Sequence, residues 1–178
     1  MRWNRLIIIL AVAVVLLLAT GLALALQFNL SALPEPCSFE NETATRARHI
    51  LVGRASRHGI PAEPRRNEQS VAQGDKLYGA ECAMCHGLDA AHGTDTGRWM
   101  YPRAANLRSS EVQSYSNPEL FWIIKNGIRL SGMPAFGNVE TDDDIWALVY
   151  YLRTLDSTGS QGHRGHEGAL DQPATTPL

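Results

Sequence analysis

The sequence predicts an all-α protein in which a membrane-spanning helix precedes a compact helical domain. Three observations lead to this fold class. An apolar run of 21 residues, Leu6 to Leu26, lies near the N-terminus. Further along, three segments combine helix-start residues with an apolar helical period. No run alternates polar and apolar residues with the period of a β-strand, and no internal repeat is visible.

The apolar run is long enough for a membrane anchor. At ~1.5 Å per residue it extends about 31 Å, which matches a bilayer core of roughly 30 Å. Arg2 and Arg5 precede it, so residues 1–5 are expected in the cytoplasm and the rest of the chain on the outer side. The alternative is a signal peptide cleaved near Ala23-Leu24-Ala25. The uncut length favours a membrane anchor over residues 6–26, and both interpretations export the remainder of the chain.

The rest of the chain divides into a linker, a domain and a tail. Residues 27–69 are broken by four prolines and are predicted to be mostly a tether, although residues 42–56 have the composition of a short helix. Residues 157–178 contain Gly, Ser, Thr, His and Pro without an apolar period, which predicts a disordered tail. The compact domain is therefore expected over residues 70–156.

Three main helices are expected in this domain. The first begins at Ser70, whose hydroxyl is a suitable cap. The second begins at Asn117, with a proline in its first turn, and stops at Gly127. The third follows the cap residue Thr141, has three aspartates in its first turn, and ends near Leu155.

The domain is acidic. Residues 70–156 contain seven Lys and Arg against eleven Asp and Glu, a net charge of −4. Nucleic acid is therefore not an expected partner, because such binding depends on a basic surface. A solvated surface accounts for this charge, and steering of a basic redox partner is the functional alternative.

Cys82-Ala83-Met84-Cys85-His86 carries the strongest chemical signal. Cys-x-x-Cys-His is the pattern for covalent haem attachment, since two thiols on one turn reach the two vinyl groups and the adjacent imidazole stands over the iron. A thioredoxin-like dithiol would need a βαβ context, and a zinc site would need further ligands. A disulfide across three residues of a helical turn would be strained. We therefore predict one covalent haem c, with His86 as an iron ligand.

A methionine is expected as the second axial ligand, because a thioether keeps the iron low-spin and raises its potential. Met1 would lie across the membrane, and Met84 lies between the two attachment thiols. Met100 is more readily explained as core filler. Met133 lies between the second and third helices, in a stretch free to reach the face opposite His86. Met133 is therefore the predicted ligand.

Other residues are predicted to surround the cofactor. A ligating histidine normally donates its other ring N–H to an acceptor, and the carbonyl of Pro102 is the candidate. Arg103 and Ser131 are predicted to contact the haem propionates. Three apolar residues are expected to form walls of the pocket: Leu107, Trp122 and Ile123.

Several short motifs accompany the haem motif. They are Gly74 with Tyr78, Tyr101 to Leu107, Asn126-Gly127, Gly132 to Gly137, Trp146, and Tyr150 to Leu152. Together, over residues 70–155, they resemble class I c-type cytochromes, and especially the single-haem modules of membrane-anchored bacterial cytochromes and oxidase subunits. The resemblance implies that Gly74 lets the first helix cross closely against the last, with Tyr78 meeting Trp146 or Tyr150. It also implies Met133 as axial ligand and Pro102 as the carbonyl partner of His86.

The function predicted from these features is electron transfer between a donor and an acceptor redox protein. The leading hypothesis is a tethered periplasmic carrier that is not an enzyme. The alternative is the haem c subunit of a membrane-bound dehydrogenase or terminal oxidase complex. A haem-based gas sensor, which needs an open sixth position, is a third possibility. No nucleophile–base pattern or second metal site is visible, so no catalytic residues and no small-molecule substrate are expected.

Overall fold

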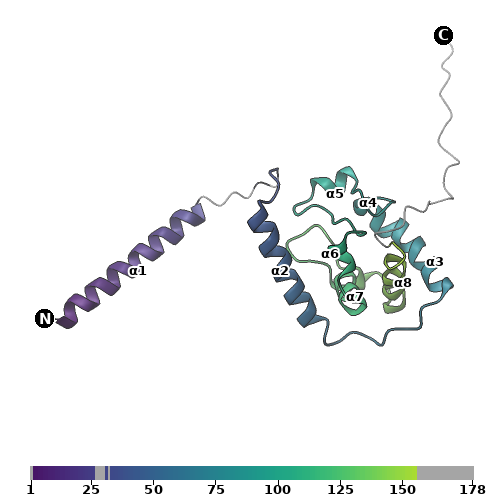
Figure 1. Ribbon diagram of the computed structural model, residues 1–178, viewed down its shortest axis with the longest axis horizontal. Coiled ribbons are helices and arrows are strands. Elements are labelled where there is room, and N and C mark those ends of the chain that lie inside the picture. The colour runs from purple at the N-terminus through teal and green to yellow at the C-terminus, as the bar shows by residue number, and fades with distance from the viewer. Residues whose placement is uncertain (1, 27–30, 32, 156–178) are drawn as a thin grey trace, which may run out of the picture. The chain divides into compact units, whose positions relative to one another are not determined.

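The structure is a computed structural model that describes residues 2–26, 31 and 33–155 of the 178-residue chain. It divides into two compact units, Met1–Pro34 and Glu35–Leu178. All regular elements among the described residues are helical, as Figure 1 shows, so the predicted all-α class is confirmed. The tail predicted to be disordered, 157–178, lies outside the described residues.

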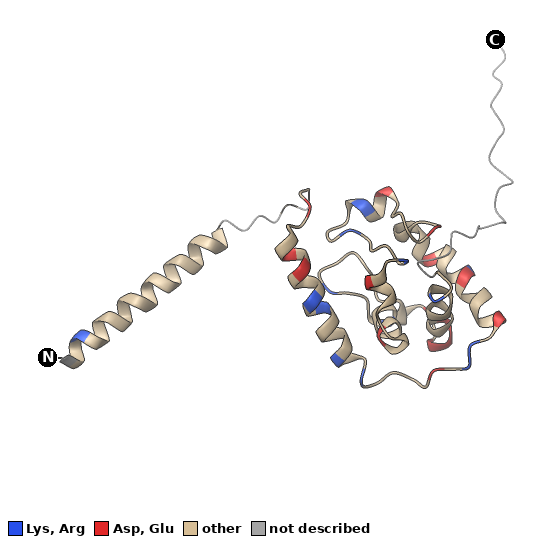
Figure 2. Ribbon diagram, in the orientation of Figure 1, with Lys and Arg blue, Asp and Glu red and all other residues tan. Residues whose placement is uncertain are grey.

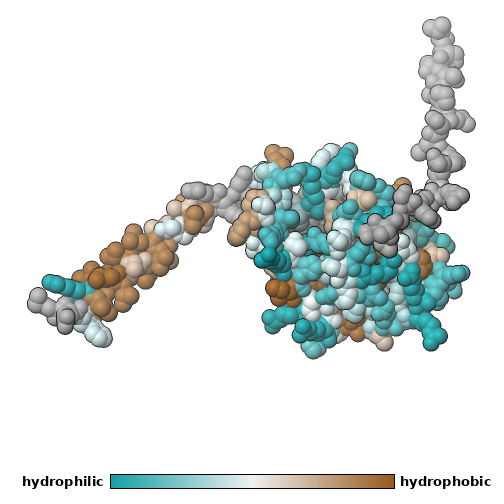
Figure 3. Space-filling model, in the orientation of Figure 1, coloured by the Kyte–Doolittle hydropathy of each residue, from teal (hydrophilic) through white to brown (hydrophobic). Residues whose placement is uncertain are grey.

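The first unit consists of one long apolar helix, α1 (Arg2–Leu26). Its residues Trp3–Leu26 are long and apolar enough to cross a membrane, and none of that window is buried within the protein. Figure 3 shows apolar side chains along its visible face. A helix that is apolar on all sides needs an apolar surrounding, which a bilayer supplies. The predicted anchor is thus a formed helix, although a signal sequence would have the same character.

The second unit begins with a helix inside the segment predicted to be a tether. Helix α2 (Ser38–Ala55) contacts α7 (Asn117–Asn126) and buries Val52. Most of the remaining α2 side chains are polar, and Figure 2 shows acidic and basic residues along the helix. The short helix expected over residues 42–56 is therefore present and begins four residues earlier, whereas its packing against the domain was not predicted. The reason is that α2 docks largely through polar side chains, so it has no apolar period.

Helices α3 (Glu68–Leu77) and α8 (Asp142–Leu152) cross at the centre of this unit. A Cβ atom at Gly74 would lie 2.0 Å from the carbonyl oxygen of Ala147, so only glycine permits this crossing. The close crossing is as predicted. The tyrosine partner is not, because the ring of Tyr78 packs on Tyr151, with centroids 5.1 Å apart. The cap of α3 also differs: Asn67 accepts the backbone N–H of Ser70, which sits inside the helix.

Helices α7 and α8 complete the core. Ser116 and Glu119 form a capping box at the start of α7, and Gly127 ends it with a φ of 66°. Thr141 caps α8 through the backbone N–H of Asp144, as predicted. Every residue of α8 from Ile145 onward is buried. The two helices meet through aromatic rings, as Phe121 of α7 lies 4.5 Å from Trp146 of α8, centroid to centroid.

Short elements connect these helices and surround the site. They are the π-helical turn η1 (Tyr78–Cys82), α4 (Ala83–His86), α5 (Asp95–Trp99), α6 (Ser110–Gln113) and the 3₁₀ turn η2 (Phe136–Asn138). They place the predicted haem motif at the junction of η1 and α4.

Candidate functional site

The two cysteines and the histidine of the motif lie on one tight turn. It begins in the π-helical turn η1, a feature frequent at functional sites, and continues into α4. Gly87, with a φ of 78°, ends α4 and accepts a 2.6 Å hydrogen bond from the buried Tyr78 hydroxyl. A Cβ at Gly97 would lie 2.1 Å from the carbonyl oxygen of Cys85, so α5 packs directly on the turn. The turn is therefore fixed from both sides.

Both motif thiols are unbridged and partly buried at the edge of a cavity. Burial raises the pKa of Cys82 to about 12, with a smaller contribution from the nearby Glu81 carboxylate. The Cys82 thiol is therefore uncharged at neutral pH. The disulfide alternative considered for the motif is not the arrangement seen here.

The ring of His86 is oriented by one hydrogen bond. Its Nδ1 lies 2.9 Å from the carbonyl oxygen of Ala105. Because a carbonyl only accepts, Nδ1 carries the proton, and the lone pair is on Nε2, available to a metal. The prediction that Pro102 supplies this carbonyl is thus wrong. The acceptor is the carbonyl of Ala105, three residues later in the same segment. Burial lowers the pKa of His86, which favours the neutral imidazole needed for ligation.

Met133 is held in a closed loop after α7. The Ser131 hydroxyl donates to the carbonyl of Ile128 at 2.7 Å and accepts the Met133 N–H at 3.2 Å. The Met133 carbonyl in turn accepts the Ile128 N–H. A Cβ at Gly127 would lie 2.8 Å from that same Met133 carbonyl oxygen, so the glycine allows the loop to fold back on the helix end. These contacts therefore fix the backbone of Met133 beside the end of α7.

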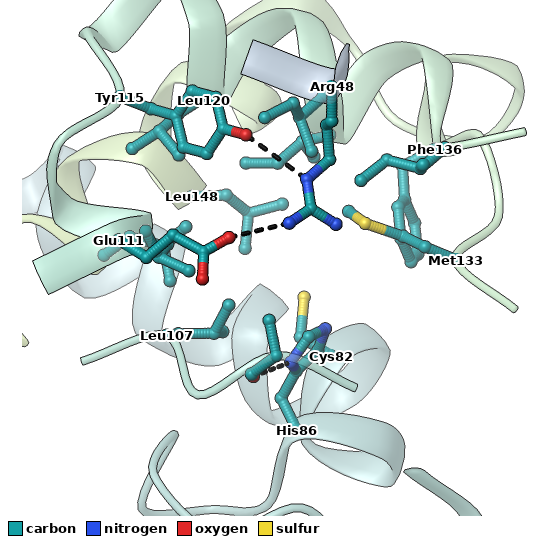
Figure 4. A pocket seen from close by; sticks show the side chains of 16 residues that line it. Arg48, Cys82, His86, Leu107, Glu111, Tyr115, Leu120, Met133, Phe136 and Leu148 are labelled. Carbon is teal, nitrogen blue, oxygen red and sulfur yellow. Dashed lines mark hydrogen bonds and ion pairs between the residues drawn. The ribbon is translucent and has the colours of Figure 1, made fainter. Parts of the chain in front are cut away.

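His86 and Met133 line the same cavity, which has two adjoining parts. Figure 4 shows the two side chains entering one part from different sides, with Cys82 beside His86. The walls of that part are mainly aliphatic and aromatic. They include Leu107, Val112, Leu120, Ile123, Ile124, Ile128, Phe136, Leu148 and Leu152. The other part adjoins Cys85 and the Met100–Ala105 segment.

Of the remaining residues predicted to surround the cofactor, some line the cavity and one does not. Leu107 lines the cavity as predicted, whereas Trp122 is half-buried and outside both parts of its lining. Pro102 and Arg103 border the second part, where Arg103 forms a 2.7 Å ion pair with Glu35. Ser131 lies there too, and its hydrogen bonds go to the Met133 loop.

Three polar residues at the cavity were not predicted from the sequence. Arg48 of α2 extends into it, where its Nη2 lies 2.7 Å from a Glu111 carboxylate oxygen and its Nε 3.3 Å from the Tyr115 hydroxyl (Figure 4). No motif marks any of the three. Because α2 has no apolar period, no sequence pattern indicates that one of its arginines lies at the site.

The site has the donor set that covalent haem requires. Two unbridged thiols stand beside an imidazole whose Nε2 lone pair is available, and a thioether enters the same cavity. The aliphatic walls suit the apolar face of a porphyrin, whose burial contributes about 25 cal/mol per Å². These four side chains, Cys82, Cys85, His86 and Met133, therefore fit the group that the motif predicts.

Comparisons with known proteins match the stretch of the chain that contains the motif. Residues 69–152 match the family model described as cytochrome c oxidase, cbb3-type, subunit III. Two curated relatives are cbb3-type cytochrome c oxidase subunits FixP. The one from Sinorhizobium medicae is 28% identical over 61% of this chain and 38% of its own length. The one from Rhizobium meliloti is 27% identical over 66% and 41%. The chain thus spans about two fifths of the relatives it matches.

A solved structure shows the same fold. It is a chain of the reducing HAO-like protein complex Kustc0457/Kustc0458 of Kuenenia stuttgartiensis. The TM-score is 0.51 at 20% identity, covering 55% of this chain and 49% of that one. Helical architecture, haem motif and family match coincide over one stretch of sequence. Residues 69–152 are a c-type cytochrome domain, a family that carries covalently bound haem c.

Proposed function

We propose that this chain transfers electrons through a single haem c, bound to Cys82 and Cys85, with His86 and Met133 as axial ligands. One observation carries the proposal: the attachment turn and the Met133 loop face a common apolar cavity. The haem supplies the redox chemistry, as its iron accepts and returns one electron. The sequence contains one Cys-x-x-Cys-His motif, which supports one haem.

The residues of the chain set the conditions for this transfer. The Ala105 carbonyl keeps the proton on His86 Nδ1 and thereby fixes the ring orientation. The hydrogen-bonded 128–133 loop holds the backbone of Met133 in one place, from which its thioether would supply the second iron ligand. The apolar walls keep water from the iron and favour the less charged ferrous state.

The chain acts as a non-catalytic electron-transfer subunit of a membrane-bound oxidase or dehydrogenase complex. Both curated relatives bear the name of an oxidase subunit, which supports a subunit over a free carrier. Its partners are then the redox proteins that donate to and accept from the haem. Helix α1 anchors it by a single pass, and Arg2 and Arg5 before the span favour a haem domain on the periplasmic side.

Purification of the full chain from its native membrane in mild detergent tests this proposal. We expect a reduced-minus-oxidised spectrum of haem c, with further subunits co-purifying and substrate-dependent haem reduction. A haem-loaded chain without stable partners, reduced only by a separate redox protein, would instead indicate the free carrier. A correctly exported chain without covalent haem would exclude both functions.

A further inference from the structure

The cavity contains a cation that belongs to neither the haem motif nor the matched family segment. Arg48 lies on α2, outside residues 69–152. Its guanidinium borders both parts of the cavity, as do Cys82, His86 and Met133. Its side chain is 27% exposed, whereas that of Arg46 on the same helix is 75% exposed. The two arginines therefore differ in surroundings, although they are two residues apart.

Contacts around Arg48 hold it in this inward position. Its guanidinium reaches Thr45 on its own helix, Glu111 on α6 and the hydroxyl of Tyr115. Next to it, the His49 ring stacks on Tyr115, with centroids 4.1 Å apart and planes within 5°. Val52, one turn further along α2, is buried. The orientation of α2 is therefore set by packing, and that orientation directs Arg48 into the cavity.

The side chains around this guanidinium leave it suited to bind a further anion. The walls near it are mainly aliphatic, and the carboxylate that it pairs with, Glu111, has a side chain that is 47% exposed. Haem c carries two propionate carboxylates. A guanidinium is planar, always charged, and matches a carboxylate with two parallel N–H donors. Arg48 thus has the chemistry and the position for a propionate. Arg103 borders only the second part of the cavity and is paired there with Glu35, whereas Arg48 borders both parts.

We propose that Arg48 binds a haem propionate, and that α2 thereby raises the reduction potential of the haem. This rests on the proposed function, because it requires haem in the cavity. A positive charge near the ring favours the ferrous state, which carries one positive charge fewer than the ferric state. The segment between membrane helix and cytochrome domain is then part of the redox site as well as a connection.

Redox titration of the full, haem-loaded chain tests this, with Arg48→Gln compared to Arg46→Gln. We expect Arg48→Gln to lower the potential, so that the ferrous-to-ferric ratio at the wild-type midpoint falls on the order of tenfold. Arg46→Gln, which removes the same charge from an exposed site, should behave as wild type. Arg48→Lys should recover most of the shift, which a purely structural role would not produce. Equal potentials for the two Gln variants would overturn the proposal.

If a variant fails to bind haem, a measurement on the wild-type protein still tests the proposal. The propionate bending mode in the resonance Raman spectrum should shift in D₂O, because an Arg N–H donor exchanges its proton. An unshifted mode would contradict the contact. If the wild type itself holds no haem, the proposed function fails; if haem is bound and Arg48 has no effect, only the role of Arg48 fails.

Discussion

The α3–α8 crossing and the docked helix α2 bury their residues in different ways. At the crossing, Gly74 brings one backbone onto another, and every residue of α8 from Ile145 onward is buried. Helix α2 buries one residue, Val52, and otherwise uses ion pairs, hydrogen bonds and a stacked ring. Helix α3 of the crossing continues directly into the turn that carries Cys82, Cys85 and His86, whereas α2 contributes Arg48 to the cavity lining. We therefore predict that α2 opens more easily than the core formed by α3, α7 and α8.

The largest effect is expected from adding a side chain at Gly74, where the backbones of α3 and α8 are in contact. Gly74→Ala places a methyl group 2.0 Å from the Ala147 carbonyl oxygen, where only backbone movement relieves the clash. We expect a loss of about 3 kcal/mol or more in the free energy of unfolding. The haem content per polypeptide should fall with it. Both are measured by denaturant titration and by pyridine haemochrome assay.

Gly79→Ala is the matched control, because nothing lies within 4 Å of a Cβ at that position. It should keep the haem content and stability of the wild type. A Gly74→Ala protein as stable as this control would show that α3 and α8 do not depend on their close approach.

A smaller and more local effect is expected at α2. Val52→Ala removes buried methyl groups worth about 1 to 2 kcal/mol. We expect amides of residues 38–55 to exchange faster with D₂O, while α3, α7, α8 and the haem spectrum stay unchanged. Leu51→Ala serves as control, since Leu51 is 63% exposed on the same helix. Loss of haem or global unfolding in Val52→Ala would mean that α2 belongs to the cooperative core.

The smallest effect on stability is expected at Asp89, three residues after His86. The backbone N–H and ring of His92, and then the N–H of Ala91, donate to Asp89 and lower its pKa to about 2. An unfolded aspartate has a pKa near 3.9, so this carboxylate stabilises the fold above about pH 4 and loses that contribution as pH falls toward 2. The Asp89 side chain is about half exposed, so the contribution stays under about 1 kcal/mol.

Thermal melts of wild type and Asp89→Asn between pH 6 and pH 2 measure this. The two melting temperatures should converge as the solution is acidified, because the wild type loses what the variant never had. A constant difference across this range would assign the effect of Asp89 to something other than its charge.

The core of the fold was predictable, and the four residues predicted to hold the cofactor do line one cavity, whereas the residues around them were only partly predicted. Local sequence signals predicted the cap at Thr141, the helix end at Gly127 and the close crossing at Gly74, and the structure has all three. The acceptor for His86 was misplaced because a proline-containing loop can present several carbonyls, and its path depends on tertiary packing. Arg48 was missed for a related reason, since a polar helix leaves no period by which its inner face is recognised.

The contact of Tyr78 on α8 was also predicted only approximately. Trp146 or Tyr150 was predicted, yet Tyr151, the next residue along, takes the contact. One residue on a helix is a rotation of about 100°. Sequence alone does not settle that rotation when all of these residues are apolar or aromatic and buried.

Axial ligation is the central claim, and the absorption spectrum of the oxidised, haem-loaded chain tests it most directly. A thioether bound to ferric haem gives a weak far-red charge-transfer band, which wild type and Met100→Ala should show and Met133→Ala should lack. Met100 is the right control, since it lines the same cavity and packs on Gly132. If the band persists in Met133→Ala, or disappears in Met100→Ala instead, the assignment of Met133 is contradicted.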